Sequence, residues 1–237
     1  MKVAMVRIGI DTGSGGIHGP LFQDGTFEYI PIPDGYGIDN RTYSNTSGQH
    51  GRELIEYFPK SKHTKMSHQS IHFDPEFTTF TYGDPTTPKS GLRHLQAGDY
   101  LVFYCSLEGW DCNTEPGLYL MGYFEISFAG YASEFTPVQV QELFGENFHV
   151  RHTSVYGRQK EKLVLVKGSH NSRMLSKAVL ISTMGKDKTG KPLKILSPEM
   201  RNYFGDFKGK LSFQRSPTRW VDADFTERAV QFVRSLT

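Results

Sequence analysis

The sequence predicts an α+β fold: one domain, residues 1–237, with a mixed and largely central β-sheet and a few short flanking helices. Three observations lead to this prediction. Aromatic and β-branched residues gather in short segments, as is typical of strands. The segments with helical patterns are short and do not alternate regularly with these strands, which disfavours a doubly wound parallel sheet. No linker-like or repeated segment divides the 237 residues.

The N-terminal part of the chain is predicted to hold two strands and a long loop. Val3–Ile10 is rich in Val, Ile and Met, so it is expected to form a buried strand that ends at Asp11. Phe27–Ile32 is a shorter extended segment beside prolines that resist ladder pairing, which predicts an edge strand. Asp34–Gly51 is polar and rich in glycine, and a loop of this length is usually functional or disordered. Arg52–Phe58 is expected to form a short helical turn.

The middle of the chain carries the clearest strand patterns. His63–Ser90 is interrupted by prolines and is expected to be irregular. Asp99–Cys105 and Gly117–Ile126 are aromatic and β-branched, so they are predicted to be central strands. Further strands are predicted at Leu163–Val166 and Ala178–Ile181, with basic loops between them.

Three helices are predicted in the second half. Thr136–Phe144 begins with a threonine that can cap the helix and a proline at the first helical position. Ser197–Phe204 repeats this start with Ser-Pro. Asp224–Leu236 is amphipathic, since its apolar residues recur at helical spacing. The residues on that apolar face are Phe225, Ala229, Phe232, Val233 and Leu236.

Composition predicts a folded protein of a reducing compartment. Hydrophobic residues make up 37% and aromatic residues 13% of the chain, enough for a packed core. Cys105 and Cys112 are too few for a disulfide framework, and no apolar segment is long enough to span a bilayer. We therefore expect a cytoplasmic protein without a membrane partner. His63, His68 and His72 lack the local Glu of a zinc hydrolase motif, so neither a metal site nor another cofactor is expected.

Charge is distributed unevenly along the chain. Residues 1–149 contain 9 Lys and Arg against 18 Asp and Glu, a net of −9. Residues 150–237 contain 18 Lys and Arg against 7 Asp and Glu, a net of +11. A basic half attracts phosphate backbones, which predicts DNA as a partner. The alternative is that the acidic and basic halves neutralise each other on the folded surface.

The glycine-rich segment after the first strand is the strongest candidate for a working site. Its glycines permit positive φ and close approach of a ligand, and its free amides can bind an anion. Neither a P-loop lysine nor the helix of a dinucleotide fingerprint follows it. We expect Asp11 to be the catalytic carboxylate, which activates water or stabilises a developing cation. The pocket beside it is predicted to include Gly13, Ser14, Gly15, Gly16 and His18. The alternative is a tight turn capped by Asp11.

The segment 72–85 interleaves aromatic rings with carboxylates. Aromatic rings stack on bases, and carboxylates accept hydrogen bonds from exocyclic amino groups. Tyr82 and Asp84 are therefore predicted to line a base pocket. An equally supported alternative is a loop anchored by buried aromatics, in which Asp74 and Asp84 begin Asp-Pro turns.

Two further segments complete the predicted site. Glu108 and Trp110 lie in a polar loop after a central strand, where folds often present site residues. The alternative for Trp110 is that it covers the core. Arg215, Ser216 and Arg219 surround a Ser-Pro turn, and this combination of guanidinium and hydroxyl groups suits phosphate. These three residues are predicted to bind DNA phosphates, with two solvated arginines as the alternative.

Five segments together resemble one known family. The segments are VRIGIDTGSGGIHGPLF, FDPEFTTFTYGDP, AGDYLVFYCSLEGW, SPEMRNYFGDF and QRSPTRW, and they span nearly the whole chain. In these segments the chain is similar to the third nucleotide-modification-associated domain family, prokaryotic and phage proteins connected with hypermodification of DNA bases. The resemblance implies recognition of, or action on, unusual bases in DNA, and it brings no established catalytic residues. GDYLVFY also resembles the opening strand of small modified-base reader barrels of the PUA-like class.

Three functions are compatible with these patterns. The first is an enzyme that processes a modified base in DNA, best explained as a glycosylase with a role in phage defence. Cleavage of an N-glycosidic bond needs a carboxylate and donors for the leaving base, and a flipped base needs an aromatic pocket beside a basic face. The second is a non-catalytic reader of modified bases. The third is a base-modifying transferase that uses a nucleotide-linked donor.

Overall fold

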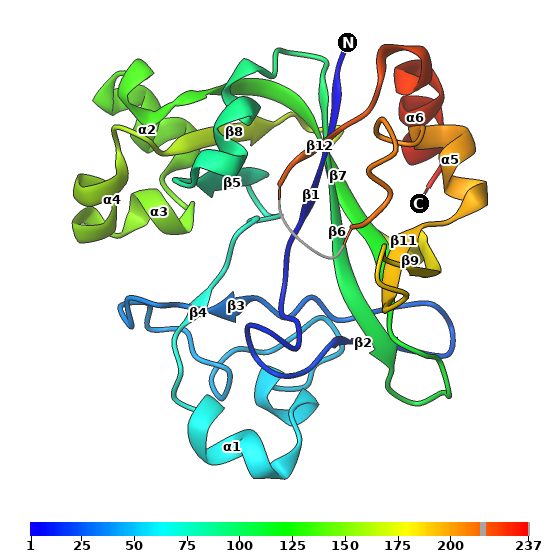
Figure 1. Ribbon diagram of the computed structural model, residues 1–237. Helices are drawn as coiled ribbons and strands as arrows, with labels where there is room; N and C mark the ends of the chain where they lie inside the picture. Colours follow the sequence, from blue (N-terminus) through cyan, green and yellow to red (C-terminus); the bar gives the residue numbers. More distant parts are fainter. Residues whose placement is uncertain (214–216, 237) are drawn as a thin grey trace.

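The computed structural model describes residues 1–213 and 217–236 (Figure 1). Within these residues the largest element is a mixed sheet of eight strands. Its strands are β1 (Val3–Arg7), β2 (Gly19–Leu21), β5 (Thr81–Asp84), β6 (Tyr100–Gly109), β7 (Gly117–Tyr131), β8 (Val164–Gly168), β9 (Arg173–Leu180) and β12 (Arg219–Trp220). The order is β12-β1-β6-β7-β8-β5, with β2 paired to β6 and β9 to β7. β1 and β2 run parallel to β6, and the other pairs are antiparallel. The predicted α+β class with a mixed central sheet is confirmed.

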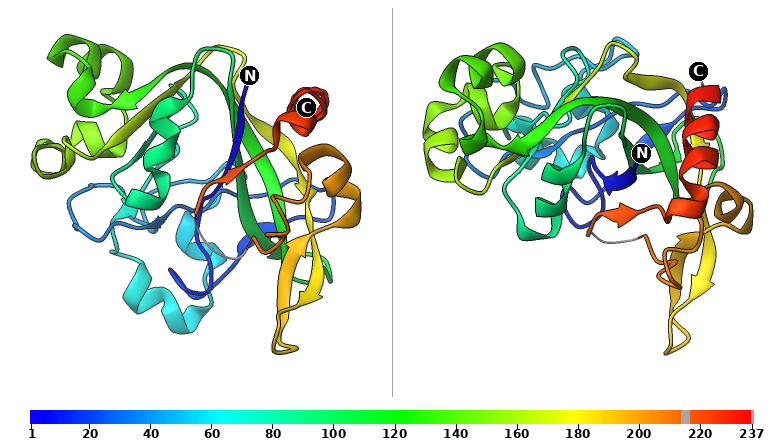
Figure 2. Two further views of the ribbon diagram at one scale, coloured as in Figure 1. Left: turned by 45° about the horizontal axis from the view of Figure 1, so that its top comes forward. Right: turned by 90° about the horizontal axis from the view of Figure 1, so that it is seen from above.

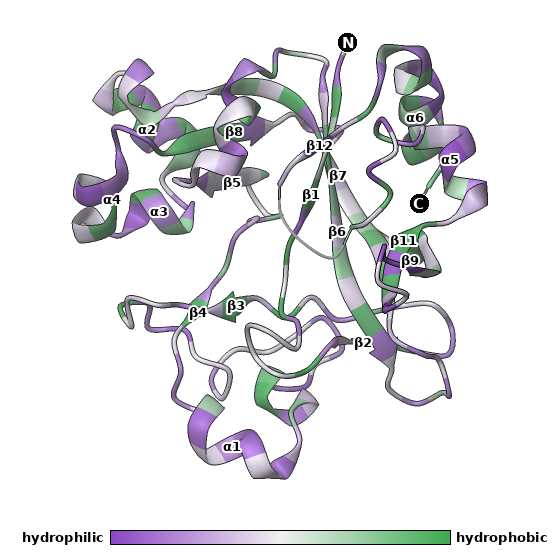
Figure 3. Ribbon diagram, viewed as in Figure 1, coloured by the Kyte–Doolittle hydropathy of each residue, from purple (hydrophilic) through white to green (hydrophobic). Residues whose placement is uncertain are grey.

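Strand β6 is buried on both faces because its alternating side chains enter two different cores. Tyr100, Val102 and Tyr104 belong to one core, whereas Leu101 and Phe103 point into the other. Burying each such side chain contributes about 1.5–3 kcal/mol, so the central strands anchor the fold. Figure 3 shows apolar residues along these long strands.

Five of the six α-helices in the described residues stand at two sides of the sheet (Figures 1 and 2). They are α2 (Pro137–Phe144), α3 (Phe148–Arg151) and α4 (Thr153–Gln159) beside β8, and α5 (Pro198–Phe204) and α6 (Ala223–Ser235) on the face of the first core. The predicted caps of α2 and α5 are confirmed. The Thr136 hydroxyl accepts from the amide of Gln139 at 3.2 Å, and the Ser197 hydroxyl accepts from the amide of Met200 at 3.3 Å. The predicted apolar face of α6 packs into that core, as expected.

A third, smaller core lies under the N-terminal loops. It is enclosed by the 3₁₀ helix η1 (Leu54–Tyr57), α1 (Lys60–Met66) and the paired strands β3 (Ile32–Pro33) and β4 (Ile71–His72). Tyr43 is fully buried there, and its hydroxyl donates to a backbone carbonyl at 2.7 Å. The long polar loop is thus anchored to the body of the protein.

Strands β10 (Ser182–Lys186) and β11 (Pro192–Leu196) form a separate antiparallel hairpin. Figure 2 shows this hairpin projecting from the body of the molecule. Two 3₁₀ helices, η2 (Thr87–His94) and η3 (Ala132–Glu134), complete the elements. Among the described residues, no helix has the length and apolar character needed to cross a membrane.

Two predictions of local structure are wrong, and one element was not predicted. Residues 27–31 form no strand, and only Ile32 enters one, the two-residue β3; Phe27 makes an isolated bridge, and Glu28 accepts hydrogen bonds from the amides of Gln49 and His50. The segment 63–90 is more regular than predicted, because its prolines stand at element boundaries rather than inside elements. The β10–β11 hairpin was not predicted, since the lysines of 186–194 obscure the strand alternation.

Candidate functional site

A hollow of about 420 Å³ is lined by residues that lie far apart in the sequence. Its polar lining consists of Arg7 at the end of β1, Tyr36 of the long loop, His72 and Asp74 at β4, Asp84 and Thr86 at β5, Lys89 of η2, His149 of α3 and Gln159 of α4. We call it the Asp74 hollow. Its volume lies within the range of small-molecule sites, about 300–1,000 Å³.

The Asp74 carboxylate is fixed within this hollow, with only 3% of the side chain exposed. Its Oδ2 accepts a hydrogen bond from the Gly83 amide at 2.9 Å, and its Oδ1 accepts one from the Asn147 side chain at 3.2 Å. Oδ2 also lies 3.4 Å from Nε2 of His149. Burial raises the pKa of Asp74 to about 6, although the hydrogen bond and charge of His149 act in the opposite direction.

The His149 ring is oriented through its other nitrogen. Nδ1 lies 2.7 Å from Oε1 of Gln159, and the Gln159 amide donates to the Tyr36 hydroxyl at 2.8 Å. Because an amide oxygen faces Nδ1, that nitrogen carries a proton, and Nε2 is the atom directed at Asp74. Burial lowers the pKa of His149, but the hydrogen bond and charge of Asp74 outweigh it, and the net shift is upward.

His72 approaches the same two side chains. Its Nε2 lies 3.2 Å from Nε2 of His149 and 3.9 Å from Oδ2 of Asp74. Its ring packs against Phe148, with centroids 4.0 Å apart. Burial, followed by the charge of His149, lowers the pKa of His72 to about 3, so this ring is neutral near pH 7.

Close approach of these groups depends on Gly83 of β5. A Cβ at this position would lie 2.8 Å from the His149 ring and 2.8 Å from the Asn147 side-chain oxygen. Asn147 is fully buried; it caps α3 by accepting from the His149 amide at 3.1 Å while it donates to Asp74. The glycine and the cap together hold α3 against β5.

The same hollow also holds an acid and a base on other elements. The Asp84 carboxylate accepts from the Tyr82 hydroxyl at 3.0 Å and from the Thr86 amide at 2.7 Å. Lys89 is 3% exposed, and its Nζ has no hydrogen-bond partner among the described residues. Burial lowers the pKa of Lys89 to about 8, against the attraction of Asp84. An ammonium placed in this way can stabilise negative charge on a ligand in the hollow.

The glycine-rich segment forms a turn around the carboxylate of Asp11. Asp11 Oδ1 accepts from the amides of Gly13 and Ser14, each at 2.8 Å, and Oδ2 lies 3.0 Å from the guanidinium of Arg7. Burial acts to raise the pKa of Asp11, but Arg7 and these hydrogen bonds lower it overall. The carboxylate is therefore ionised and engaged on both oxygens.

A second hollow, of about 500 Å³, lies beside this turn. It is lined in part by Gly16 and His18 of the turn, Tyr57 of η1, and Glu108 and Trp110 at the end of β6. We call it the Trp110 hollow. Trp110 is 42% exposed, and its ring stands edge-on to Tyr57 at a centroid distance of 5.2 Å. An exposed indole in such a hollow can stack on a base.

The projecting hairpin is an exposed basic segment. Lys186, Lys188 and Lys191 are exposed on it, with Asp187 as the acidic residue between them. Lys194 lies in the middle of β11, opposite Met184, and its charge follows burial as the second cause that lowers the pKa of His18, a residue of the Trp110 hollow.

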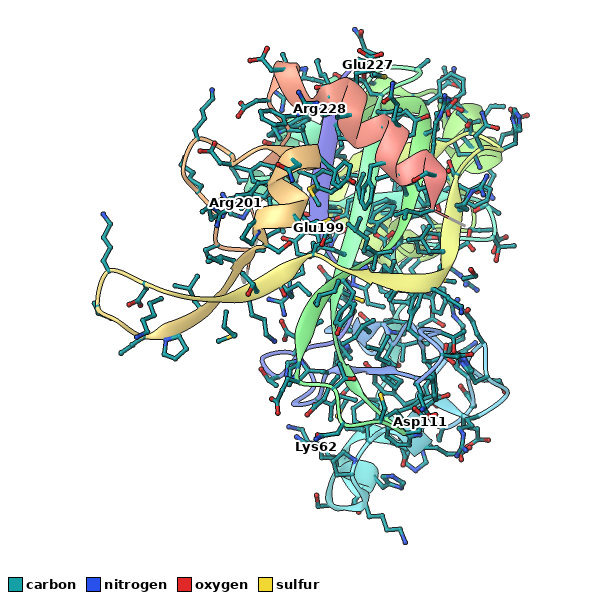
Figure 4. The ribbon with its side chains drawn as sticks, turned by 90° about the vertical axis from the view of Figure 1, so that its right-hand side faces the viewer. Lys62, Asp111, Glu199, Arg201, Glu227 and Arg228 are labelled. Atoms are coloured by element: carbon teal, nitrogen blue, oxygen red, sulfur yellow. The ribbon has the colours of Figure 1, made fainter. Side chains whose placement is uncertain are left out.

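The neighbouring helices α5 and α6 carry both signs of charge. In Figure 4, Glu199 and Arg201 of α5 and Glu227 and Arg228 of α6 are labelled on the same side of the molecule. The basic half is therefore not uniformly positive, and its lysines are most concentrated on the hairpin.

A family model described as nucleotide modification associated domain 3 matches residues 2–235. The chain belongs to this family. No curated protein and no solved structure matches it. The resemblance found in the sequence is thus confirmed over nearly the whole chain, and with it an association with nucleotide modification.

The pocket residues predicted from the sequence of this family member lie in two different hollows. Gly16, His18, Glu108 and Trp110 line the Trp110 hollow, whereas Tyr82 and Asp84 line the Asp74 hollow. Arg7 connects the two regions, because it lines the Asp74 hollow and pairs with Asp11. The roles predicted for these residues, and for Gly13, Ser14 and Gly15 of the turn, stay predictions.

The three predicted phosphate-binding residues are only partly described. Arg215 and Ser216 lie outside the described residues. Arg219 of β12 is half-buried and donates to the Ser212 carbonyl at 2.6 Å. Its role in binding phosphate also stays a prediction.

The cluster of His72, Asp74 and His149 was not predicted from the sequence. Asp74 belongs to a segment for which base recognition and an Asp-Pro turn are equally supported, and nothing in the sequence singles out His149. They are 75 positions apart, so no local spacing joins them. The available signal was the pair His72 and Asp74, two residues apart in a segment already noted for its aromatics and carboxylates.

Proposed function

We propose that this protein is an enzyme that hydrolyses the N-glycosidic bond of a modified base in DNA, with the reaction in the Asp74 hollow. The family supports a link to nucleotide modification. The observation that carries the proposal is the arrangement of Asp74, His149 and His72, whose facing atoms are 3.2–3.9 Å apart in a hollow of ligand size.

The reaction uses groups that the hollow provides. A base rotated out of the helix enters the hollow. Water attacks C1′ of the sugar, the C1′–N bond breaks, and its electron pair leaves on the base. The proton of the water passes to a carboxylate of the hollow, Asp74 or Asp84. The departing base takes a proton from the ammonium of Lys89, whose positive charge also stabilises the charge that builds on that base.

Asp11 is the alternative catalytic carboxylate. It is the first residue of the glycine-rich turn and contacts Arg7, which lines the Asp74 hollow. Against this role, Arg7 and the hydrogen bonds to its oxygens lower the pKa of Asp11, whereas burial raises the pKa of Asp74. The carboxylate with the lowered pKa is the weaker base.

A non-catalytic reader is the second candidate function, and the exposed Trp110 favours it. A base inserted between Trp110 and the other walls of its hollow would be recognised by stacking and by the polar groups of His18 and Glu108. In that case modified DNA binds, Trp110→Ala weakens the binding, and no base is released.

The test is incubation of the protein with genomic DNA from phages with modified and unmodified bases. Free bases are identified by mass spectrometry, and abasic sites are counted by strand cleavage in alkali. We expect modified bases to be released only from modified DNA. Release that requires an added nucleotide-linked donor would instead indicate a transferase, and binding without release would indicate a reader.

Two substitutions then locate the carboxylate. We expect Asp74→Asn to lower turnover by about 10²–10⁴-fold, as loss of a general base usually does, while the protein keeps its circular dichroism spectrum. Asp206→Asn is the control, because Asp206 is exposed, caps a turn through the amide of Lys208 and lines neither hollow. If Asp11→Asn abolishes turnover and Asp74→Asn does not, the catalytic role belongs to Asp11.

A further inference from the structure

We propose that His72, Asp74 and His149 bind one divalent transition-metal cation of the zinc class, with His72 Nε2, Asp74 Oδ2 and His149 Nε2 as ligands. This inference departs from the expectation, drawn from the sequence, that the protein has no metal site. It deepens the proposed function, since the cation would activate the water in the Asp74 hollow, but the binding itself does not depend on that function.

The distances between the three atoms match those between ligands of one metal ion. Ligands about 2.0–2.2 Å from a common cation, at tetrahedral or octahedral angles, stand roughly 3.0–3.4 Å apart. The two imidazole nitrogens are 3.2 Å apart, and Asp74 Oδ2 is 3.4 Å from His149 Nε2. The remaining separation, 3.9 Å between Asp74 and His72, needs a shift of only a few tenths of an ångström on each side.

The surrounding hydrogen bonds are those of an organised metal ligand shell. Gln159 accepts from Nδ1 of His149, so the neutral ring directs its Nε2 lone pair at the other two ligands. Tyr36 in turn holds Gln159. Asn147 holds the second oxygen of Asp74, which fixes the direction of the carboxylate. Outer groups of this kind orient metal ligands and fix the tautomer of a ligating histidine.

A second histidine–aspartate pair in the protein differs from the Asp74 cluster because an arginine already neutralises its carboxylate. His152 Nε2 lies 3.2 Å from Asp39, but Arg41 pairs with the same carboxylate at 2.8 Å and neutralises it. Among the described residues, the charged partners of Asp74 are the two histidines alone. Two imidazoles and a carboxylate that face one another need a proton or a cation between them, and a divalent cation satisfies all three at once.

The proposed cation would have open positions towards the hollow. All three ligands line the Asp74 hollow, so further coordination positions face the space where substrate would lie. Three protein ligands with an open position are typical of catalytic rather than structural zinc. A water bound there has a strongly lowered pKa. With Asp74 engaged as a ligand, Asp84 is the carboxylate that receives the proton of this water.

The test measures binding of Zn²⁺ and Co²⁺ to the full-length chain after treatment with a chelator and its removal. Titration calorimetry with ZnCl₂ gives the stoichiometry and affinity, and the visible absorption of bound Co²⁺ reports nitrogen and oxygen ligation. We expect one ion per chain. His149→Ala and His72→Ala should each weaken binding by more than about 100-fold, beyond the 10–100-fold expected for the outer-shell variant Gln159→Leu.

The matched control is His152→Ala, which removes a histidine from the pair already neutralised by Arg41 and should leave affinity unchanged. Circular dichroism verifies that each variant is folded. Binding that His72→Ala and His149→Ala leave intact, or equal losses in the His152→Ala control, would overturn the proposal, as would the absence of stoichiometric binding by the folded wild type.

This experiment separates the metal site from the proposed function. Stoichiometric binding without base release would keep the metal site and reject the glycosidic reaction. Base release by a chelator-treated protein that binds no metal would keep the glycosidic reaction and reject the metal site.

Discussion

Lys89 is a buried charged side chain that we expect to lower the stability of the fold while it acts in the Asp74 hollow. Its ammonium is buried and has no hydrogen-bond partner among the described residues. Leaving a buried polar group unsatisfied costs about 1–3 kcal/mol. We therefore expect Lys89→Met to raise the free energy of unfolding by an amount of this order at pH 7, measured by urea denaturation. Turnover on modified DNA should fall in the same variant, because the charge that stabilises the leaving base is lost.

The stabilisation expected for Lys89→Met depends on pH, and the sign of this dependence follows from the pKa of Lys89. The pKa of Lys89 is about 8 in the folded protein and near 10.5 when the chain is unfolded. Between these values the unfolded state binds more protons, so the stability of the wild type rises with pH. The advantage of Lys89→Met should be complete at pH 7 and should shrink from pH 8 towards pH 10. Lys167→Met is the control: Lys167 donates to the Thr79 carbonyl, so its removal should not stabilise the protein.

At the residue scale, the sequence signalled the unusual backbone around Asp11 but not the cluster of Asp74 and His149, and the roles predicted for the site residues stay predictions. Asp11 and the glycine turn were recognisable, because consecutive glycines after a strand signal unusual backbone geometry. The cluster of Asp74 and His149 was not, because it forms only when α3 packs on β5 across the Asn147 cap. Contacts between residues distant in sequence leave no periodic pattern.

At the scale of elements, the β10–β11 hairpin is the segment we expect to bind DNA phosphates. Its exposed lysines project from the body of the protein (Figure 2). Each phosphate contact on duplex DNA contributes about 0.9 to the slope of log affinity against log salt. Replacing Lys186, Lys188 and Lys191 by Gln should lower the slope by about one to three and weaken binding irrespective of base sequence. Fluorescence anisotropy at several salt concentrations measures both quantities.

The control for the hairpin variant removes three lysine charges from other elements. Lys60 and Lys65 of α1 and Lys160 after α4 are exposed and lie on other elements. Their replacement by Gln should leave the salt slope nearly unchanged. Equal losses in the two triple variants would mean that net charge, and not the hairpin, determines binding.

Elements with strong local signals were predicted from the sequence, and elements held by tertiary contacts were not. The helices α2, α5 and α6 have a cap or an amphipathic face that fixes their start or their buried side. In contrast, α3 has four residues, too few to show a helical period, and its cap is Asn147. β5 was hidden by the proline that follows it.

At the scale of the whole molecule, the acidic and basic halves share one sheet. β12 of the basic half pairs with β1, and β8 and β9 pair with β7 of the acidic half. The core on one face likewise combines Val3 and Tyr100 with Phe204 and Val233. The acidic and basic halves of the chain are therefore interleaved in one sheet and one core. That the chain unfolds as a single unit stays a prediction.

The two tryptophans make this prediction testable, because they report on different halves. Trp110 stands beside Tyr57 under the N-terminal loops, and Trp220 lies in β12 at the edge of the sheet. In the variants Trp220→Phe and Trp110→Phe, fluorescence follows one region at a time. We expect both to unfold with the same midpoint in urea, coincident with circular dichroism, because separating the halves would break β1 from β12 and β7 from β8 together.

Limited proteolysis should cut the tip of the β10–β11 hairpin first. Two midpoints, or two stable fragments divided near residue 150, would show instead that the halves fold independently.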